Sequence, residues 1–254
     1  MHIMAIPCRG MGERMRSIQP DGNKLAIDVA GVSALQRHLK FASFWHFDDV
    51  VVSTLPEFGG WVRDEGKGMV LVEDSWPVQD VDGPALSMRC CLSMIPTLPE
   101  ETLVTFVFSD TFIDPMYPNP EVSICHLDEG THYDAIGAEM VVGTAVCAYM
   151  RDGRPWMNVN AVPEKLISRF PSKPKDEHPS LATVGVFTHT LRAWQNVLAS
   201  ADKDPSLGLF NGFSPLVHQG RTNYGMAPVQ IDPSMWYDIG TEENYKRTVD
   251  HFKR

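Results

Sequence analysis

Residues 2–24 read HIMAIPCRGMGERMRSIQPDGNK and place a glycine-rich, basic loop directly after a short apolar run. The apolar part, residues 2–8, has the length and composition of a buried strand. The loop that follows carries glycines at positions 10 and 12, arginines at 9, 14 and 16, and a lysine at 24. The whole chain has a formal net charge of -10, so these cations do not belong to a general basic surface. They indicate a site for a specific anion.

The spacing within this loop separates three kinds of phosphate-binding motif. A dinucleotide-binding GxGxxG needs a third glycine where the chain has Met15, and the Gly-Lys-Ser/Thr ending of a Walker A loop is absent. The remaining arrangement is GxGxRM, formed by Gly10, Gly12, Arg14 and Met15, with Lys24 ten residues after the arginine. In such a loop the glycines let backbone N–H groups approach a triphosphate, and the two cations neutralise charge at its α-phosphate. A surface turn with solvated basic side chains explains the loop, taken alone, equally well.

Composition narrows the class of protein. The chain has 254 residues, of which 43% are hydrophobic and 21% charged, as in ordinary globular proteins. Its acidic balance disfavours nucleic acid and anionic membranes as partners, because both need a basic face. The five cysteines include no CxxC pair, so neither a disulfide framework nor a zinc site is indicated. With no secretory signal and no apolar run of about 20 residues, we expect a cytoplasmic protein.

The order of apolar runs predicts an α/β fold. In the first half, continuous apolar runs alternate with segments of helical spacing, which favours a mostly parallel sheet with helices on both faces. The predicted strands are 2–8, 48–54, 69–74 and 103–108, and the predicted helices are 33–44, with Ser33 as N-cap, and 83–98, with a short helix or turn at 56–66.

The second half has a different texture, and the proline-rich segment 114–120 is the best candidate boundary between the halves. No internal repeat or long linker is present, so we expect a single α/β domain over 1–254 with an extended second half. Its predicted strands are 138–150, 155–162, 181–189 and 227–232, with a helix at 191–200.

Several segments resemble, in the same order, those of the sugar nucleotidyltransferases, the NTP-transferase branch of the GT-A fold. That family opens with a strand and a Gly-x-Gly-x-Arg-Met/Leu loop and ends with a Trp-x-Asp-x-Gly-Thr-x-x-x-Tyr signature. The resemblance spans nearly the whole chain, and its motifs are degenerate. They are IPCRGMGERM (6–15), NKLAIDVAGVSALQRHL (23–39), VDGPALSMRCCL (81–92), LVTFVFSDTFID (103–114), FPSKPKDEHPSLATVGVF (170–187) and MWYDIGTEENYKRTVDHF (235–252).

The resemblance assigns roles to the matched residues. It implies that Arg14 and Lys24 activate the NTP phosphates, that Asp110 and Asp238 hold Mg²⁺, and that Lys173 contacts the phosphate of the acceptor. The implied nucleotide-binding residues are Cys8, Arg9, Gly10, Gly12 and Gly83. It also implies a nucleotide-binding half, 1–115, and an acceptor-binding half, 116–254.

Each assignment has a structural alternative. Asp110 could begin an Asx-turn, and Asp238 could belong to a turn before a helix that Thr241 caps. Lys173 could be a loop lysine, and Lys165 offers a second Glu-Lys pair. Cys8 is better explained by packing than as a nucleophile.

The chain also departs from the family pattern at several positions. Pro7, Cys8 and Arg9 stand where small residues are usual, and Arg9 could reach a phosphate or point to solvent. The other departures are Asn23 in place of a proline, Ser109 in place of a glycine and Ser172 in place of a glutamate.

The implied activity is Mg²⁺-dependent condensation of an NTP with a sugar 1-phosphate, giving an NDP-sugar and pyrophosphate. The implied partners are therefore an NTP and a phosphorylated small-molecule acceptor. Dimers and tetramers are common in the family, so a homo-oligomer is a further possibility. A cytidylyltransferase acting on a non-sugar phosphate or phosphonate, and a non-catalytic nucleotide-binding relative, are the alternatives. A GT-A glycosyltransferase would usually carry Asp-x-Asp, whereas residues 110–112 read DTF.

Overall fold

The computed structural model describes residues 1–10, 13–76, 84–95, 97–114, 141–151, 160–161, 167–169, 179–203 and 224–253. The chain forms two compact units. The first consists of Met1–Pro118 together with Ser234–Arg254, and the second of Asn119–Pro233. The first unit is therefore completed by a segment that follows the whole second unit in sequence.

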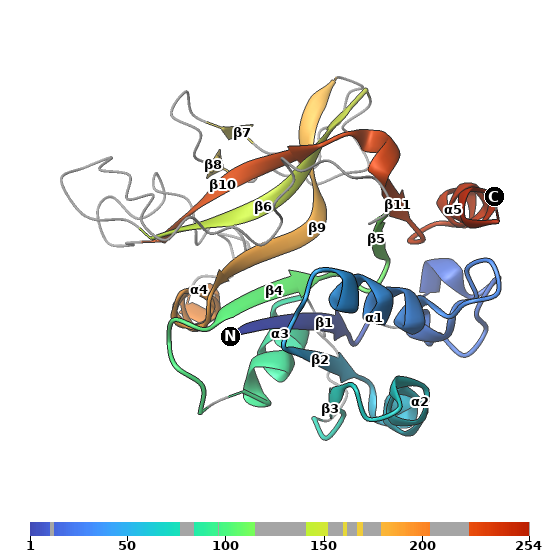
Figure 1. The fold of residues 1–254 in the computed structure, drawn as a ribbon, viewed down its shortest axis with the longest axis horizontal. Helices are drawn as coiled ribbons and strands as arrows, with labels where there is room; N and C mark the ends of the chain where they lie inside the picture. Colours follow the sequence, from blue (N-terminus) through green and yellow to red (C-terminus); the bar gives the residue numbers. More distant parts are fainter. Residues whose placement is uncertain are drawn as a thin grey trace. The chain divides into compact units, whose positions relative to one another are not determined.

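The first unit is built on a parallel sheet (Figure 1). Its strands are β1 (His2–Cys8), β2 (Asp49–Thr54), β3 (Leu71–Glu73) and β4 (Leu103–Val107), in the order β4-β1-β2-β3. Each neighbouring pair is parallel. The central strands are rich in valine and isoleucine and are buried along almost their whole length, as a sheet covered on both faces requires.

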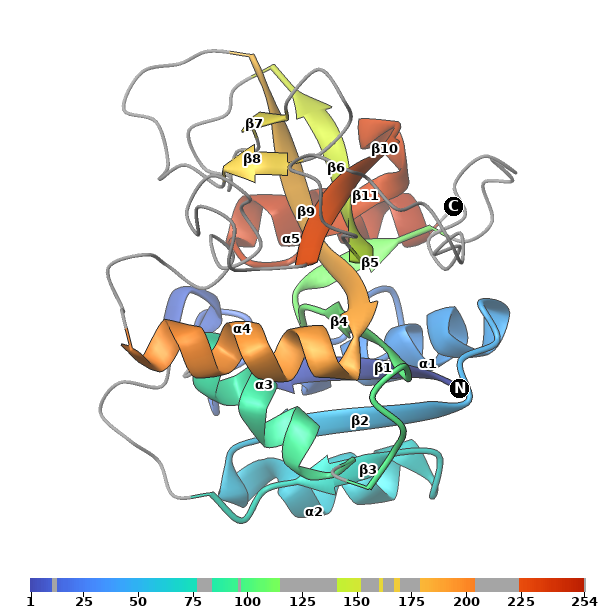
Figure 2. The same cartoon turned by 90° about the vertical axis from the view of Figure 1, so that its left-hand side faces the viewer.

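Three helices connect these strands. They are α1 (Ala34–Phe44), α2 (Pro56–Gly66) and α3 (Pro84–Ser93). Ser33 caps α1 by accepting a hydrogen bond from the Gln36 N–H, and Pro56 occupies the first turn of α2, where its missing N–H costs nothing. Right-handed crossovers put α1 and α2 on one face and α3, which leads back to β4, on the other (Figure 2). Accordingly, α1 contacts α2, whereas α3 contacts β1 and β2.

The C-terminal segment completes the first unit. Strand β11 (Trp236–Asp238), preceded by the 3-10 turn η5 (Pro233–Met235), pairs antiparallel with β5 (Thr111–Ile113). Helix α5 (Glu242–Phe252) follows, with the Thr241 hydroxyl accepting from the Asn244 N–H as N-cap.

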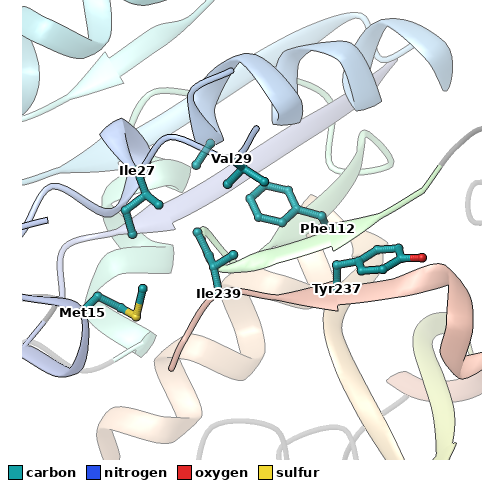
Figure 3. Close-up of a cluster of buried hydrophobic side chains, with 7 residues drawn as sticks. Met15, Ile27, Val29, Phe112, Tyr237 and Ile239 are labelled. Atoms are coloured by element: carbon teal, nitrogen blue, oxygen red, sulfur yellow. The ribbon is translucent and has the colours of Figure 1, made fainter. Parts of the chain in front are cut away.

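A buried apolar cluster joins this segment to the basic loop (Figure 3). Met15, in the 3-10 turn η1 (Glu13–Met15), and Ile27, just after the turn η2 (Lys24–Ala26), pack with Phe112 and Ile239. Because α5 also packs against this cluster, the C-terminal segment fixes the loop that the sequence singles out. The full cluster is Met15, Ile27, Val29, Ala34, Phe112, Tyr237 and Ile239, with Ile18, Tyr245, Val249 and Phe252 against it.

The second unit contains β6 (Val141–Met150), β9 (Ser180–Thr190) and β10 (Tyr224–Ile231) in the order β10-β6-β9. Strand β10 is parallel to β6, and β6 is antiparallel to β9. Helix α4 (Leu191–Lys203) follows β9, and β7 (Asn160–Ala161) pairs with β8 (Ile167–Arg169).

The predicted α/β class, with a mostly parallel sheet flanked by helices, is confirmed. The segment 56–66, predicted as a helix or turn, is a full helix. The helix predicted over 83–98 ends at Ser93, and of the strand predicted over 155–162 only residues 160–161 are described. The division into nucleotide-binding and acceptor-binding halves stays a prediction. No helix in the described part of the chain has the length and apolarity needed to span a bilayer.

Candidate active site

The basic loop and the Asp110 loop meet at the carboxyl edge of the first unit's sheet. Strands β1 and β4 are parallel neighbours, so the loops that leave their carboxyl ends emerge side by side. Between these loops and the start of α3 lies an open cavity of about 240 Å³. Its lining includes six of the residues that the sequence predicts for the site: Cys8, Arg9, Gly10, Arg14, Lys24 and Asp110.

Lys24 reaches the acidic side of this cavity. Its Nζ lies 3.4 Å from Asp110 Oδ2, and both side chains are about one-fifth exposed. The turn before it is held without the proline that the family carries, because the Asn23 N–H donates to Asp21 Oδ1 at 2.8 Å. This Asx-turn supplies rigidity of the kind a proline would give.

Asp238 lies next to Asp110 because β11 pairs with β5. The register sets Asp238 opposite Thr111, and the Ile239 N–H donates to the Asp110 carbonyl at 2.9 Å. Burial, and then the charge of Asp110, raise the pKa of the Asp238 carboxyl to about 6, while donors from Asn244 and Gly240 and the charge of Arg14 oppose the rise. Two residues separated by 128 positions (238 − 110) thus form one acidic pair.

Gly240 keeps the space beside this pair open. A Cβ built on Gly240 would lie 3.3 and 3.4 Å from the two carboxylate oxygens of Asp238 and 3.5 Å from Asp110 Oδ2. One point therefore has oxygens of both carboxylates around it. Mg²⁺ usually takes one or two carboxylates together with phosphate oxygens and water, so this donor set fits it. No cluster of three or more metal-binding side chains occurs among the residues that the structure describes.

The Cys8 thiol is a packing group in this structure. It is buried, and burial raises its pKa, although the hydroxyl of Ser109 and the charge of Lys24 act in the opposite direction. A buried thiol that keeps its proton is a poor nucleophile, which agrees with the interpretation from sequence.

The Arg9 side chain is buried and hydrogen-bonded to the backbone, and it does not point to solvent. It is 1% exposed, and its guanidinium donates to the Thr54 carbonyl at 3.0 Å and the Trp76 carbonyl at 2.9 Å. The arginine therefore ties the basic loop to the end of β2 and to the segment after β3. Its assignment to nucleotide binding stays a prediction.

We expect Arg9→Ala to lower the free energy of unfolding by about 3 kcal/mol, because it leaves two carbonyls without their donor and opens a void. Urea unfolding followed by circular dichroism measures the change. Arg16→Ala removes an exposed arginine from the same loop and should change stability by less than about 0.5 kcal/mol. Equal effects of the two substitutions would contradict the buried-clamp role of Arg9.

His38, on α1, contacts the loop that carries Asp110 through the Ser109 carbonyl. It is 1% exposed, its Nε2 lies 3.3 Å from the Ser109 carbonyl, and its ring lies 5.0 Å from that of Phe112. Burial lowers the pKa of His38 to about 4, against the smaller raising effects of the Ser109 carbonyl and the Asp110 charge. The ring is therefore neutral at pH 7 and donates from Nε2.

This burial predicts acid sensitivity. Between pH 6.5 and 4 the unfolded chain protonates His38 and the folded chain does not, so stability falls as the pH falls through that window. The loss attributable to His38 approaches about 3 kcal/mol near pH 4. His38→Gln should flatten the dependence of the urea midpoint on pH over this range, and His2, whose pKa is also lowered to about 4, titrates in both proteins. An unchanged slope would show that His38 is not the group responsible.

Three predicted site residues, Gly12, Gly83 and Lys173, lie outside the described residues. The predicted Thr241 cap is present, and Asp238 lies beside Asp110, but the assignment of Asp238 to metal binding stays a prediction.

The site also contains residues that sequence reasoning missed: His38, Gly240 and Asn244. Gly240 and Asn244 lie within the C-terminal signature, which could have drawn attention to them. His38 lies on the apolar face of a helix and carries no such signal.

No protein-family model matches the chain, and the comparison with curated proteins finds no match. Solved structures do match, and they define the fold as that of the sugar-phosphate nucleotidyltransferases, the family that the motifs resemble.

One of these structures is described as a glucose-1-phosphate thymidylyltransferase from Bacillus anthracis, with a TM-score of 0.74 at 15% identity, covering 100% of this chain and 95% of that one. The inositol-1-phosphate CTP transferase from T. maritima has a TM-score of 0.69 at 14% identity, with 100% and 96% covered. HddC from Yersinia pseudotuberculosis has a TM-score of 0.65 at 12% identity, with 99% of each chain covered.

Proposed function

We propose that this protein is a Mg²⁺-dependent nucleotidyltransferase that condenses an NTP with a sugar 1-phosphate to give an NDP-sugar and pyrophosphate. The observation that carries the proposal is the convergence of Lys24, Asp110 and Asp238 at the carboxyl edge of the sheet. The fold shared with nucleotidyltransferases of two different bases and two different acceptors supports the class of reaction.

The reaction joins two polyanions, so the chain has to position them and neutralise their charge. A phosphate oxygen of the acceptor attacks the α-phosphorus of the NTP. The bond between that phosphorus and the oxygen bridging to the β-phosphate breaks, and the electron pair leaves with pyrophosphate. No proton transfer is required of a side chain, because the attacking oxygen is already ionised at neutral pH.

The residues divide this work. Arg14 and Lys24 stabilise the negative charge that develops on the α-phosphate and on the leaving group. Asp110 and Asp238 would hold Mg²⁺, which would supply further neutralisation of the phosphate charge. Lys24 Nζ lies 3.4 Å from Asp110 Oδ2, so this carboxylate orients the ammonium group that would contact phosphate.

The acceptor contacts belong to the part of the chain after residue 115, with Lys173 as the predicted partner of the acceptor's phosphate. One neighbour is described as a thymidylyltransferase and another as a CTP transferase, so the test includes all five nucleoside triphosphates.

The test is pyrophosphate release with Mg²⁺ from each of ATP, CTP, GTP, UTP and dTTP against a panel of sugar 1-phosphates and alkyl phosphates. We expect release with one base and a sugar 1-phosphate, abolished by chelation. Release only with CTP and a non-sugar phosphate would favour the cytidylyltransferase. Nucleotide binding without release, on a folded sample and across the whole panel, would favour the non-catalytic relative.

A further inference from the structure

The carboxylate of Asp238 is held asymmetrically. Its Oδ1 accepts two hydrogen bonds, one from Asn244 Nδ2 at 2.7 Å and one from the Gly240 N–H at 3.1 Å. Among the residues that the structure describes, none donates to Oδ2. Both oxygens lie near the position that a Gly240 Cβ would take, Oδ2 at 3.3 Å and Oδ1 at 3.4 Å, so the hydrogen bonds alone distinguish them. Asp110 Oδ2 lies near the same position. One oxygen of Asp238 is therefore engaged by the protein, and the other is left for a ligand.

The Asn244 side chain is not needed to start α5. The backbone N–H of Asn244 donates to the Thr241 hydroxyl at 3.2 Å, and this bond caps the helix whatever side chain residue 244 carries. Asparagine is also a weaker helix former than alanine. Helix formation thus gives no reason for an asparagine at this position, whereas the 2.7 Å bond to Asp238 does.

The asymmetry bears on which cation the carboxylate can take. Mg²⁺ requires near-ideal octahedral geometry and is bound by single carboxylate oxygens, whereas Ca²⁺ accepts six to eight oxygens, including both oxygens of one carboxylate. With Oδ1 engaged by two donors, Asp238 offers a divalent cation only Oδ2. A free carboxylate would also permit the two-oxygen binding that Ca²⁺ uses.

We propose that Asn244 is a positioning residue that makes Asp238 a one-oxygen ligand and thereby sets the preference of the site for Mg²⁺ over Ca²⁺. The inference rests on the metal site of the proposed function and goes beyond it, because it assigns metal selectivity to a side chain that acts through its hydrogen bond to Asp238.

The test measures metal binding to the nucleotide-free full chain. Mn²⁺, which takes the same octahedral oxygen sites as Mg²⁺ and is visible by electron paramagnetic resonance, is titrated and then displaced by Mg²⁺ or by Ca²⁺. The variants are Asn244→Ala, which deletes the donor, and Asn244→Leu, which keeps a side chain of similar size without an N–H group and without adding charge. Glu243→Ala, a truncation at the neighbouring exposed position, is the matched control.

We expect both Asn244 variants to lower the ratio of the Ca²⁺ to the Mg²⁺ dissociation constant by about tenfold, the usual size of an outer-shell effect, and Glu243→Ala to leave it unchanged. If both metals weaken by the same factor, or if neither changes, Asn244 does not select the metal and the inference is wrong. Pyrophosphate release by the wild-type protein separates this inference from the proposed function. If the wild-type protein releases pyrophosphate and the Asn244 variants keep the wild-type ratio of Ca²⁺ to Mg²⁺ dissociation constants, only this inference is wrong. Failure of the wild-type chain to bind Mn²⁺ would overturn this inference, whereas the magnesium dependence is tested separately by chelation during pyrophosphate release.

Discussion

Replacing Lys24 by alanine is expected to lower kcat/KM for pyrophosphate release by about 10² to 10³, the usual cost of removing one charge-stabilising donor from a transition state. The same change should strengthen metal binding in the absence of nucleotide, because Lys24 Nζ lies 3.4 Å from Asp110 Oδ2 and competes with a cation for that oxygen. If Lys24 only supported the fold, its removal would not strengthen metal binding while lowering kcat/KM.

Steady-state kinetics and Mn²⁺ titration measure the two effects on one preparation. Lys40→Ala, on the exposed side of α1, is the matched control for loss of a lysine and should alter neither quantity. Full activity of the Lys24 variant would remove the basis for assigning the loop to phosphate binding.

Asp238→Asn is expected to abolish turnover, by at least about 10³-fold, and at the same time to stabilise the metal-free protein at pH 8. The asparagine keeps an oxygen that can accept from Asn244 and Gly240, so the local hydrogen bonds persist. It removes a carboxylate whose pKa is raised to about 6 by burial and by the neighbouring charge of Asp110.

The sign of the stability change depends on pH. Between about pH 4 and 6 the folded chain holds a proton on Asp238 that the unfolded chain releases, so stability falls as the pH rises through this window. Above it the ionised carboxylate costs roughly 2 to 3 kcal/mol, which the asparagine recovers.

Urea unfolding in the presence of a chelator, at pH 8 and pH 4, tests this expectation. The gain in unfolding free energy should be present at pH 8 and nearly absent at pH 4. Asp250→Asn, an exposed aspartate on α5, should show no such pattern. A lower unfolding free energy for Asp238→Asn than for the wild type at pH 8 would mean that burial and repulsion from Asp110 do not destabilise the ionised Asp238.

The sequence predicted the framework of the first unit because its signals are local. Continuous apolar runs and a serine before a helical pattern fixed β1, β2, β4 and the start of α1 to within a residue or two. Asp110 and Asp238 came from resemblance to a family, and no local signal would have paired them.

What the sequence did not predict is the means by which these residues are held. Strands β5 and β11 have three residues each, too few to show periodicity, and their pairing crosses the whole second unit in sequence. The clamp made by Arg9 depends on carbonyl oxygens of residues 54 and 76, whose positions follow only from the folded backbone. The bond from Asn244 to Asp238 depends on the turn geometry at Gly240 in the same way.

The pairing of β5 with β11 also determines when the acidic pair can form during translation. A ribosome adding about 5 to 20 residues per second needs roughly 6 to 26 s to travel from Asp110 to Asp238. During that interval the nascent chain can form β1 to β4, but β5 waits for its partner and the apolar cluster around Met15 lacks Tyr237 and Ile239. The acidic pair can therefore form only after the whole second unit has been synthesised, and a chain truncated before residue 238 lacks the second carboxylate.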